Sequence, residues 1–378
     1  MTNKVRVYLD NAATTKICRE AADSMHLALC SEFGNPSSVH HEGQSARKAL
    51  EEARERIAAL LGSEPSEVYF TSGGTESDNW AVSFVKMCEG KKHIITSSIE
   101  HPAVLQMCKR LEEEGFRITY LPVDKYGYVS PDALEEAISD DTALVSVMMV
   151  NNEIGTIEPI IRLSEISHKH GALFHTDAVQ AVGSLPVDFR ELGADLLSLS
   201  AHKFHGPKGS GGLLVKNGVK IPSFIFGGAQ EYHHRAGTEN VPGILGMAEA
   251  LAFSVNGMDE HLSHILALKD KLCALLKEAC PQIVFHGDIE SSHPGIVNLY
   301  VPGIDGEKMM LLLNYEGFAV SGGAACSSKD KQVSHVLKAI GTSETEAKNS
   351  LRISMSYENT EEEITSFVSA FSVIMKRM

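Results

Sequence analysis

The stretch from 198 to 212 reads Ser198-Leu-Ser-Ala-His-Lys-Phe-His-Gly-Pro-Lys-Gly-Ser-Gly-Gly212, and it places Lys203 between an apolar, strand-like run and a glycine-rich segment. A lysine becomes a nucleophile toward carbonyl carbon when burial or nearby cations lower its pKa. Small, glycine-rich surroundings leave room for a flat cofactor beside the amine. The stretch therefore indicates a lysine with a chemical task at the end of a strand.

A carboxylate that suits the ring nitrogen of such a cofactor lies upstream of this lysine. Asp177 ends the run Ala172-Leu-Phe-His-Thr-Asp177, which predicts a buried strand that opens into a loop. Charged groups at strand ends of α/β proteins lie where ligands bind. Pyridoxal phosphate (PLP) needs a carboxylate against its pyridinium nitrogen. Asp177 fits that role, and Gln180 is placed to reach the phenolic oxygen of the ring.

A phosphate-binding segment and a histidine complete this set. The segment Thr71-Ser-Gly-Gly-Thr-Glu-Ser-Asp-Asn79 follows a strand-like run and precedes a helical one, so its glycines, the Thr75 hydroxyl and a helix N-terminus can meet an anion. It matches neither the Walker nor the dinucleotide glycine pattern. His101 follows another apolar strand, and its pKa class suits ring stacking and proton transfer near neutral pH.

Short apolar runs that are typical of strands alternate with helix-like segments along the chain. The runs cover residues 68–70, 93–97, 118–123, 143–150, 172–176, 195–200 and 211–215. This alternation predicts an α/β fold with a mainly parallel, seven-stranded sheet and helices on both faces. A helix over 260–280 is expected to connect this part to a smaller C-terminal domain.

Motifs across nearly the whole chain occur in the order and wording of the NifS/IscS-type cysteine desulfurases, which are fold-type I PLP enzymes of the class-V aminotransferase family. The sequence resembles that family at Tyr8-Leu-Asp-Asn-Ala-Ala-Thr-Thr15, Phe33-Gly-Asn-Pro-Ser-Ser38, Thr71-Ser-Gly-Gly-Thr-Glu76, Glu100-His101, Val150-Asn-Asn-Glu-Ile-Gly155, His175-Thr-Asp-Ala-Val-Gln180, Ser200-Ala-His-Lys-Phe-His-Gly-Pro-Lys-Gly209, Arg235-Ala-Gly-Thr-Glu-Asn240 and Ser321-Gly-Gly-Ala-Ala-Cys326.

The resemblance implies a role for each residue of the site. Lys203 is expected to be the Schiff-base lysine, His101 the ring-stacking catalytic residue, Asp177 the pyridinium partner and Gln180 the donor to the phenolic oxygen. The expected phosphate ligands are Gly74, Thr75, Ser200 and His202, with Thr238 reaching the phosphate from the neighbouring subunit of a homodimer. Asn152 and Arg352 are expected to hold the substrate carboxylate, because an arginine fork binds a carboxylate with two hydrogen bonds.

The sulfur chemistry is expected to depend on Cys326. Glycines precede this cysteine and Ser327, Lys329 and Lys331 follow it, which predicts an exposed loop whose lysines favour the thiolate. The resemblance implies that L-cysteine is converted to L-alanine while Cys326 takes the sulfur as a persulfide. A sulfur-acceptor protein, in iron–sulfur cluster assembly or tRNA thiolation, would then receive the sulfur.

The resemblance also divides the chain into domains. We expect a large PLP-binding domain over 16–257 and a small α+β domain made of 1–15 and 258–378, which carries the cysteine loop. The chain of 378 residues is long enough for two domains.

Composition narrows the classes of function. The formal net charge of −15 argues against general nucleic-acid binding. No 18-residue apolar run and no leader pattern is present, so we expect a soluble, cytoplasmic protein without a membrane segment. Seven cysteines without Cys-x-x-Cys spacing fit a reducing compartment and argue against a metal site.

Three other functions stay open on the sequence. A selenocysteine lyase would use nearly the same site, and a PLP aminotransferase would need Lys203 and Asp177 but not Cys326. A non-catalytic scaffold of the same fold is the third. One departure from the family is Tyr232-His233-His234, where members commonly carry glycine and basic residues.

Overall fold

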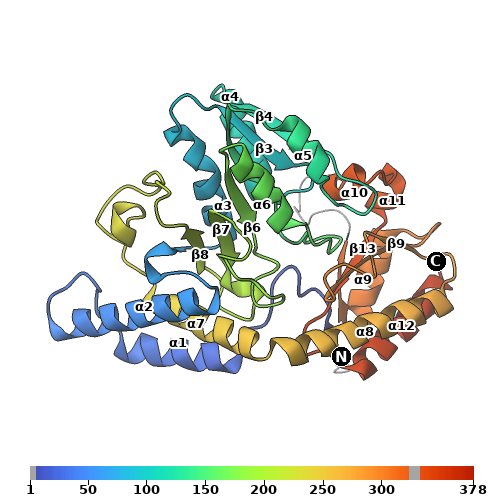
Figure 1. The fold of residues 1–378 in the computed structure, drawn as a ribbon. Coiled ribbons are helices and arrows are strands. Elements are labelled where there is room, and N and C mark those ends of the chain that lie inside the picture. Colours follow the sequence, from blue (N-terminus) through green and yellow to red (C-terminus); the bar gives the residue numbers. More distant parts are fainter. Residues whose placement is uncertain (1–5, 323–332) are drawn as a thin grey trace.

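The large sheet is the centre of the fold in the computed structural model, which describes residues 6–322 and 333–378 (Figure 1). Its strand order is β2-β8-β7-β6-β5-β3-β4. β8 is antiparallel to both of its neighbours, and the other pairs are parallel. The strands are β2 (Val68–Thr71), β3 (His93–Ser97), β4 (Arg117–Leu121), β5 (Thr142–Ser146), β6 (Leu173–Asp177), β7 (Leu196–Ser200) and β8 (Gly211–Val215). The predicted mainly parallel α/β sheet is confirmed.

Alternate side chains of these strands enter two apolar cores, one on each face of the sheet. On one face, Ile94 and Leu144 pack with α3 (Gly74–Ser83) and α4 (Pro102–Glu113). On the other, Ile95 and Val145 belong to the core that includes residues of α2 (His41–Leu60), α5 (Pro131–Ala137), α6 (Ile160–Lys169) and α7 (Val241–Asn256). Since both faces are covered, β3, β5, β7 and β8 are buried at every residue rather than at every second one.

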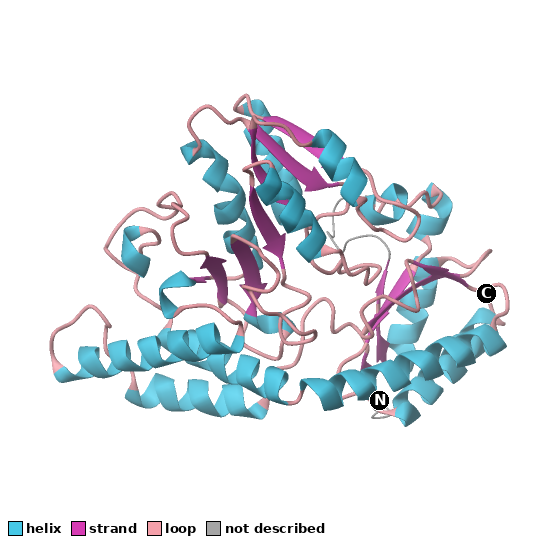
Figure 2. Cartoon of the chain, viewed as in Figure 1, coloured by secondary structure: helices cyan, strands magenta, loops and turns pink. Residues whose placement is uncertain are grey.

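A second sheet lies beside the first, as the two groups of strands in Figure 2 show. Its order is β12-β13-β10-β9, with antiparallel pairs throughout. These strands are β9 (Val284–His286), β10 (Ile296–Tyr300), β12 (Ser321–Gly322) and β13 (Leu351–Ser354). Its core includes residues of α8 (Met258–Ala279), α9 (Gly306–Glu316) and α12 (Glu361–Met375). Two short helices, α10 (His335–Ala339) and α11 (Glu344–Lys348), complete this part.

The N-terminal residues join this second part of the molecule. β1 (Val7–Tyr8) pairs in parallel with β11 (Phe318–Ala319), and Asp10 forms a bridge with Ser354. Val7 and Leu9 are buried in the core beneath the second sheet. The division into domains at residue 257 stays a prediction.

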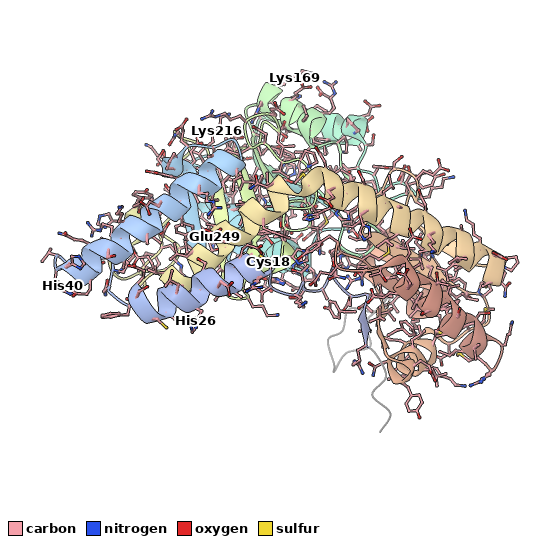
Figure 3. All side chains as sticks on the ribbon, turned by 90° about the horizontal axis from the view of Figure 1, so that it is seen from below. Cys18, His26, His40, Lys169, Lys216 and Glu249 are labelled. Carbon is pink, nitrogen blue, oxygen red and sulfur yellow. The ribbon has the colours of Figure 1, made fainter. Side chains whose placement is uncertain are left out.

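α7 forms a helical layer with α1 (Arg19–Ser31) and α2, which Figure 3 shows from below. Cys18, at the start of α1, is buried. Among the residues that the structure describes, no single helix is long and apolar enough to cross a membrane; only α7 and α8 taken together pass, across a bend of 70°.

Two predicted boundaries differ from the structure by four residues or more. β5 ends at Ser146 rather than at 150, because the chain then folds back so that Val150 bridges Ile157. The Asn151 side chain accepts hydrogen bonds from the backbone of Glu153 and Ile154 and closes that turn. α3 begins at Gly74, six residues before the apolar run from Trp80 that suggested a helix.

Replacing Phe367 with alanine tests the core beneath the second sheet. This side chain is fully buried and lies edge to face with Phe318, at 5.6 Å between ring centroids. We expect Phe367→Ala to lower the free energy of unfolding by about 3–5 kcal/mol, since a large cavity replaces the ring. Leu311→Ala, on the same part of the molecule but 59% exposed, is the control. Denaturant unfolding that fails to separate the two variants would contradict this assignment of the core.

Candidate functional site

A cavity of about 410 Å³ lies at the carboxyl edge of the large sheet, where β6 and β7 end, and β12 and β13 of the second sheet close it from the other side. Most of the residues predicted for the site line it, from six separate segments of the chain. They are Gly74, Thr75, His101, Asn152, Asp177, Gln180, Ser200, His202, Lys203 and Arg352.

Lys203 follows β7 in a short 3-10 turn and points to the N-terminal segment. Its Nζ donates hydrogen bonds to the backbone carbonyls of Ala12 and Ala13, the latter at 3.0 Å. Burial lowers the pKa of the Lys203 ammonium to about 8, and the nearby Arg352 charge adds to the effect, while Asp177 opposes it. At neutral pH about one such amine in ten is neutral, far more than for an ordinary lysine.

Asp177 ends β6 and is fully enclosed. Its Oδ1 accepts a hydrogen bond from the Val179 backbone at 2.9 Å. Burial raises the pKa of Asp177, and the charges of His101 and Lys203 together with the Val179 bond oppose this rise. A second carboxyl group, Asp78 of α3, is 1% exposed, and its Oδ1 has no hydrogen-bond partner among the described residues. A cationic ring nitrogen would compensate the charge that these carboxyl groups leave in the cavity.

His101 caps α4. Its Nδ1 accepts a hydrogen bond from the Ala103 backbone at 3.1 Å, so the neutral ring carries its proton on Nε2. Burial lowers the pKa of His101, and the Lys203 charge lowers it further, whereas Asp177 opposes both. The imidazole is therefore neutral at physiological pH.

The anion cup lies between β2 and α3. Gly73 has φ of 147°, a conformation that favours glycine. A side chain at Gly74 would bring its Cβ to 2.7 Å from Val179 Cγ2. The cup thus stays open because glycines occupy the N-cap and the first position of α3. Burial lowers the pKa of His202, whose Nδ1 lies 3.2 Å from Thr14 Oγ1, to about 4, so this histidine would act as a neutral ligand.

Arg352 extends from β13 to the opposite wall. Its Nη1 donates to the Asn152 carbonyl at 2.9 Å and its Nη2 to Asp10 Oδ1 at 2.8 Å. Its Nε is buried and has no hydrogen-bond partner among the described residues. An oriented guanidinium with a free donor is suited to a carboxylate ligand.

Three predicted residues need separate comment. Thr238 is exposed and does not line the cavity, so a single chain does not bring it to the cup. Cys326 lies outside the described residues, although β12, which leads into that segment, lines the cavity. Gln180 Nε2 donates to the Ala12 carbonyl at 2.8 Å, the same carbonyl that Lys203 contacts.

Three acidic groups of the cavity were not predicted from the sequence: Asp10, Asp78 and Glu153. Each lies inside a motif that the sequence showed. The motif gave the residue type, but it did not indicate that the side chain faces the cavity. Glu153 Oε2 accepts a hydrogen bond from Ser334 Oγ at 2.5 Å, and burial raises the pKa of this carboxyl group. This contact links the cavity wall to the chain just after residue 332.

Known proteins are similar to this chain over nearly its whole length. The model of the class-V aminotransferases matches residues 7–367. A cysteine desulfurase IscS from Methanosarcina thermophila is 46% identical over 100% of this chain and 94% of its own length. The chain belongs to the NifS/IscS-type members of this family. A putative cysteine desulfurase IscS 1 from Bacillus subtilis, with 44% identity over 99% of both chains, is another relative of this desulfurase-type chain.

Solved structures agree with the family assignment. A NifS-like protein superposes on this class-V chain with a TM-score of 0.94, at 39% identity, over 99% of this chain and 100% of that one. A structure titled "SspA in complex with cysteine" matches with a TM-score of 0.81 and 35% identity, over 93% of this chain and 99% of that one. Among the described residues, no group of three His, Cys, Asp or Glu side chains is placed to hold a metal ion.

The lowered pKa of Lys203 in this class-V chain is open to a direct test. A small aromatic aldehyde with borohydride traps neutral amines, and mass spectrometry locates the product. We expect the trapping rate at Lys203 to rise with pH with a midpoint near 8, because the neutral fraction grows through its pKa. Lys169, an exposed surface lysine, is the internal control. Identical profiles at both lysines would contradict the pKa shift.

Proposed function

We propose that this chain is a PLP-dependent cysteine desulfurase that converts L-cysteine to L-alanine and transfers the sulfur to Cys326 as a persulfide. The observation that carries the proposal is the convergence of Lys203, Asp177 and Arg352 on one cavity, in which Lys203 has a pKa of about 8. The names of the relatives support it, since several are cysteine desulfurases that match nearly the full chain.

The residues of the cavity fit PLP at three points. The cup at Gly74 and Thr75, with Ser200 and His202 opposite, suits a phosphate group. Asp177 suits a ring nitrogen, and Lys203 suits the aldehyde. When it is bound, PLP supplies an electron sink that stabilises negative charge at the substrate Cα. The cavity volume of about 410 Å³ is within the range of cofactor sites.

Arg352 would position the substrate. Its guanidinium is held by the Asn152 carbonyl and by Asp10, so it would present its remaining donor to the cysteine carboxylate without first losing side-chain entropy. This contact fixes the Cα–H bond near the Lys203 amine.

Lys203 and His101 would move the protons. Neutral Lys203 Nζ takes the proton from the substrate Cα and returns one to form alanine. His101, which holds its proton at Nε2, would donate toward the substrate thiol group. Asp177 is close enough to both groups to affect their pKa values, and it would stay ionised when paired with a cationic ring nitrogen.

The sulfur step would form one bond and break one. The Cys326 thiolate attacks the substrate sulfur, the Cβ–S bond breaks, and an S–S bond forms on Cys326 Sγ. The electron pair of the broken bond stays on Cβ, which takes up a proton. A thiol reductant then releases the sulfur as sulfide and restores the Cys326 thiol.

The partners and location are part of the proposal. Thr238 is exposed and outside the cavity of its own chain, which supports a homodimer in which it reaches the phosphate of the neighbouring subunit. A sulfur-acceptor protein would take the persulfide sulfur in a cytoplasmic setting. The large domain over 16–257 and the small domain over 1–15 and 258–378 would close on the substrate from the two sheets.

Alanine release from L-cysteine with a thiol reductant tests the function. We expect Cys326→Ala to lose most of this activity while PLP stays bound, because the sulfur then has no acceptor on the enzyme. Cys30→Ala is the matched control, since Cys30 is an exposed cysteine on α1 that does not line the cavity. Activity in this control should equal that of the unmodified chain.

Other results would redirect the assignment. Alanine that persists in Cys326→Ala would exclude the persulfide on that residue. Keto-acid-dependent amino transfer without sulfide would indicate an aminotransferase, and a strong preference for L-selenocysteine in competition would indicate a selenocysteine lyase. Bound PLP without any turnover would favour the non-catalytic scaffold.

Arg352→Lys tests the proposed carboxylate contact. Lysine keeps the charge but loses the planar fork, so we expect the KM for L-cysteine to rise at least about tenfold. Cysteamine, which lacks the carboxylate, should lose much less in the same variant. Steady-state kinetics with both compounds measures the difference, and an equal loss for both would contradict the assignment.

A further inference from the structure

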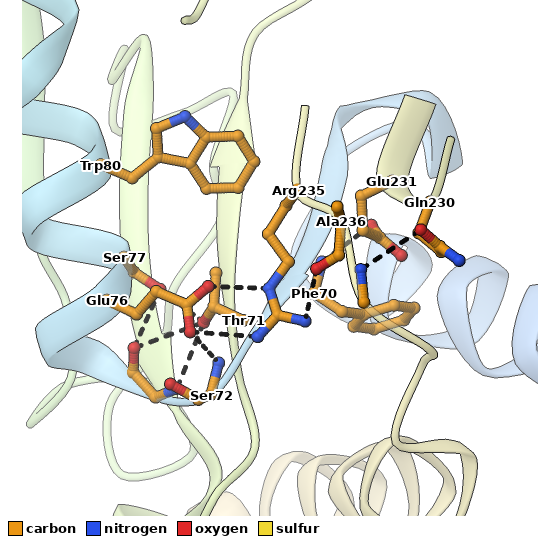
Figure 4. Close-up of polar contacts among 12 residues, drawn as sticks. Phe70, Thr71, Ser72, Glu76, Ser77, Trp80, Gln230, Glu231, Arg235 and Ala236 are labelled. Atoms are coloured by element: carbon orange, nitrogen blue, oxygen red, sulfur yellow. Dashed lines mark hydrogen bonds and ion pairs between the residues drawn. The ribbon is translucent and has the colours of Figure 1, made fainter. Parts of the chain in front are cut away.

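The segment 230–236 contacts the strand, turn and helix that form the anion cup, as Figure 4 shows, and none of its residues lines the cavity. It contains the departure Tyr232-His233-His234, and the mechanism above assigns it no role. Two ion pairs that are buried or nearly buried connect it to the cup. One contacts β2, which precedes the turn, and the other contacts α3, which follows it.

The first pair joins Arg235 to Glu76 in the first turn of α3. Arg235 Nε donates to Glu76 Oε1 at 2.8 Å and Arg235 Nη2 to Oε2 at 3.3 Å. The side chains are 21% and 10% exposed. Glu76 Oε2 also accepts a hydrogen bond from the Ser72 backbone at 2.8 Å. Glu76 thus holds the turn that precedes Gly73 and Gly74, and Arg235 holds Glu76.

The second pair anchors the other end of the segment. Glu231 accepts two hydrogen bonds from Arg54, each of 3.0 Å, and one from the Phe70 backbone at 2.9 Å. The Arg54 and Glu231 side chains are both 3% exposed. Phe70 belongs to β2, which runs directly into the cup. The segment therefore binds β2 through Glu231 and α3 through Arg235.

The backbone between these anchors is strained. Glu231, Tyr232 and His233 have φ of 43°, 55° and 69°, although none is glycine. Such conformations cost free energy and persist only where the surroundings hold them. The ion pairs at both ends, together with the Ser223 hydroxyl that donates to the His233 carbonyl at 3.0 Å, supply that hold.

Charge gives Arg235 a second effect on the cup. Burial raises the pKa of Glu76, but hydrogen bonds from Arg235 and Ser72 outweigh it and bring the pKa below its usual range. Glu76 is therefore an anion two residues after Gly74, where it would repel a phosphate. The guanidinium neutralises that charge while it fixes the carboxylate on the turn.

We propose that Arg235 is a positioning residue for the phosphate of the cofactor, which acts through Glu76 and the Ser72 turn rather than by contact. This inference rests on the proposed function for the identity of the cofactor. The clamp of Glu231 and Arg235 on β2 and α3 sets the shape of the cup, and the strained residues between them set the spacing of the two anchors.

The test is the affinity of the full-length apo chain for PLP, measured by fluorescence titration. Arg235→Gln leaves an unpaired carboxylate beside the cup, so we expect the Kd to rise about tenfold, which corresponds to about 1.4 kcal/mol. Arg235→Lys keeps the charge but loses the two-donor geometry of the guanidinium, so its Kd should lie between those of the unmodified chain and Arg235→Gln. In Glu76→Gln/Arg235→Gln the repulsion is gone, so the Kd should recover part of the way, a coupling that independent structural defects would not produce.

Arg56→Gln is the matched control, because Arg56 pairs with Glu249 between α2 and α7 and neither residue lines the cavity. Its Kd for PLP should stay within twofold of the unmodified chain. Thermal unfolding of each apo variant shows whether the stability of the fold, rather than the cup alone, has changed. If Arg235→Gln does not fold, the Kd of Arg235→Lys is compared with that of the unmodified chain instead.

The inference is overturned if Arg235→Gln binds PLP as tightly as the unmodified chain, if the control loses as much affinity, or if the double variant is no better than Arg235→Gln. An unmodified chain that does not bind PLP would instead overturn the proposed cofactor, and this outcome is seen before any variant is compared.

Discussion

The desolvation of Lys203 is the constraint on which the rest of the site depends. An ammonium group taken out of water is costly, and the two backbone carbonyls of the N-terminal segment compensate only part of that cost. The amine therefore has a pKa of about 8. To bury it, the chain must bring residues 6–15 across the end of the large sheet, and the pairing of β1 with β11 holds them there.

The acidic and basic groups of the cavity are arranged around that amine. Asp177 lies at the end of β6, and Asp78 is buried beside the cavity on α3. Asp10 holds Arg352 of the second sheet in place at the wall of the cavity. From this position the charge of Arg352 lowers the pKa of Lys203. The two sheets thus contribute charged groups of both signs to one cavity, where each charge acts strongly on the others.

The cup shows how a local motif needs distant support. Gly73 and Gly74 allow the close approach of the backbone, but the turn is fixed by Glu76, and Glu76 by Arg235 from a segment about 160 residues later. The same segment adopts left-handed backbone at Glu231, Tyr232 and His233. The segment that neutralises Glu76 through Arg235 is therefore the same segment that contains the strained backbone.

The sequence alone determined the fold class, because the seven apolar runs and the helix-like segments between them allow few arrangements other than a covered parallel sheet. It also determined the residue types of the site and the family, through Lys203, Asp177 and the glycines of the cup. Only the tertiary structure decided that Asp10, Asp78 and Glu153 share the cavity, that Arg235 neutralises Glu76, and that Thr238 lies outside the site of its own chain. These contacts join residues far apart in sequence, and burial, which sets their charge states, depends on packing that no local pattern specifies.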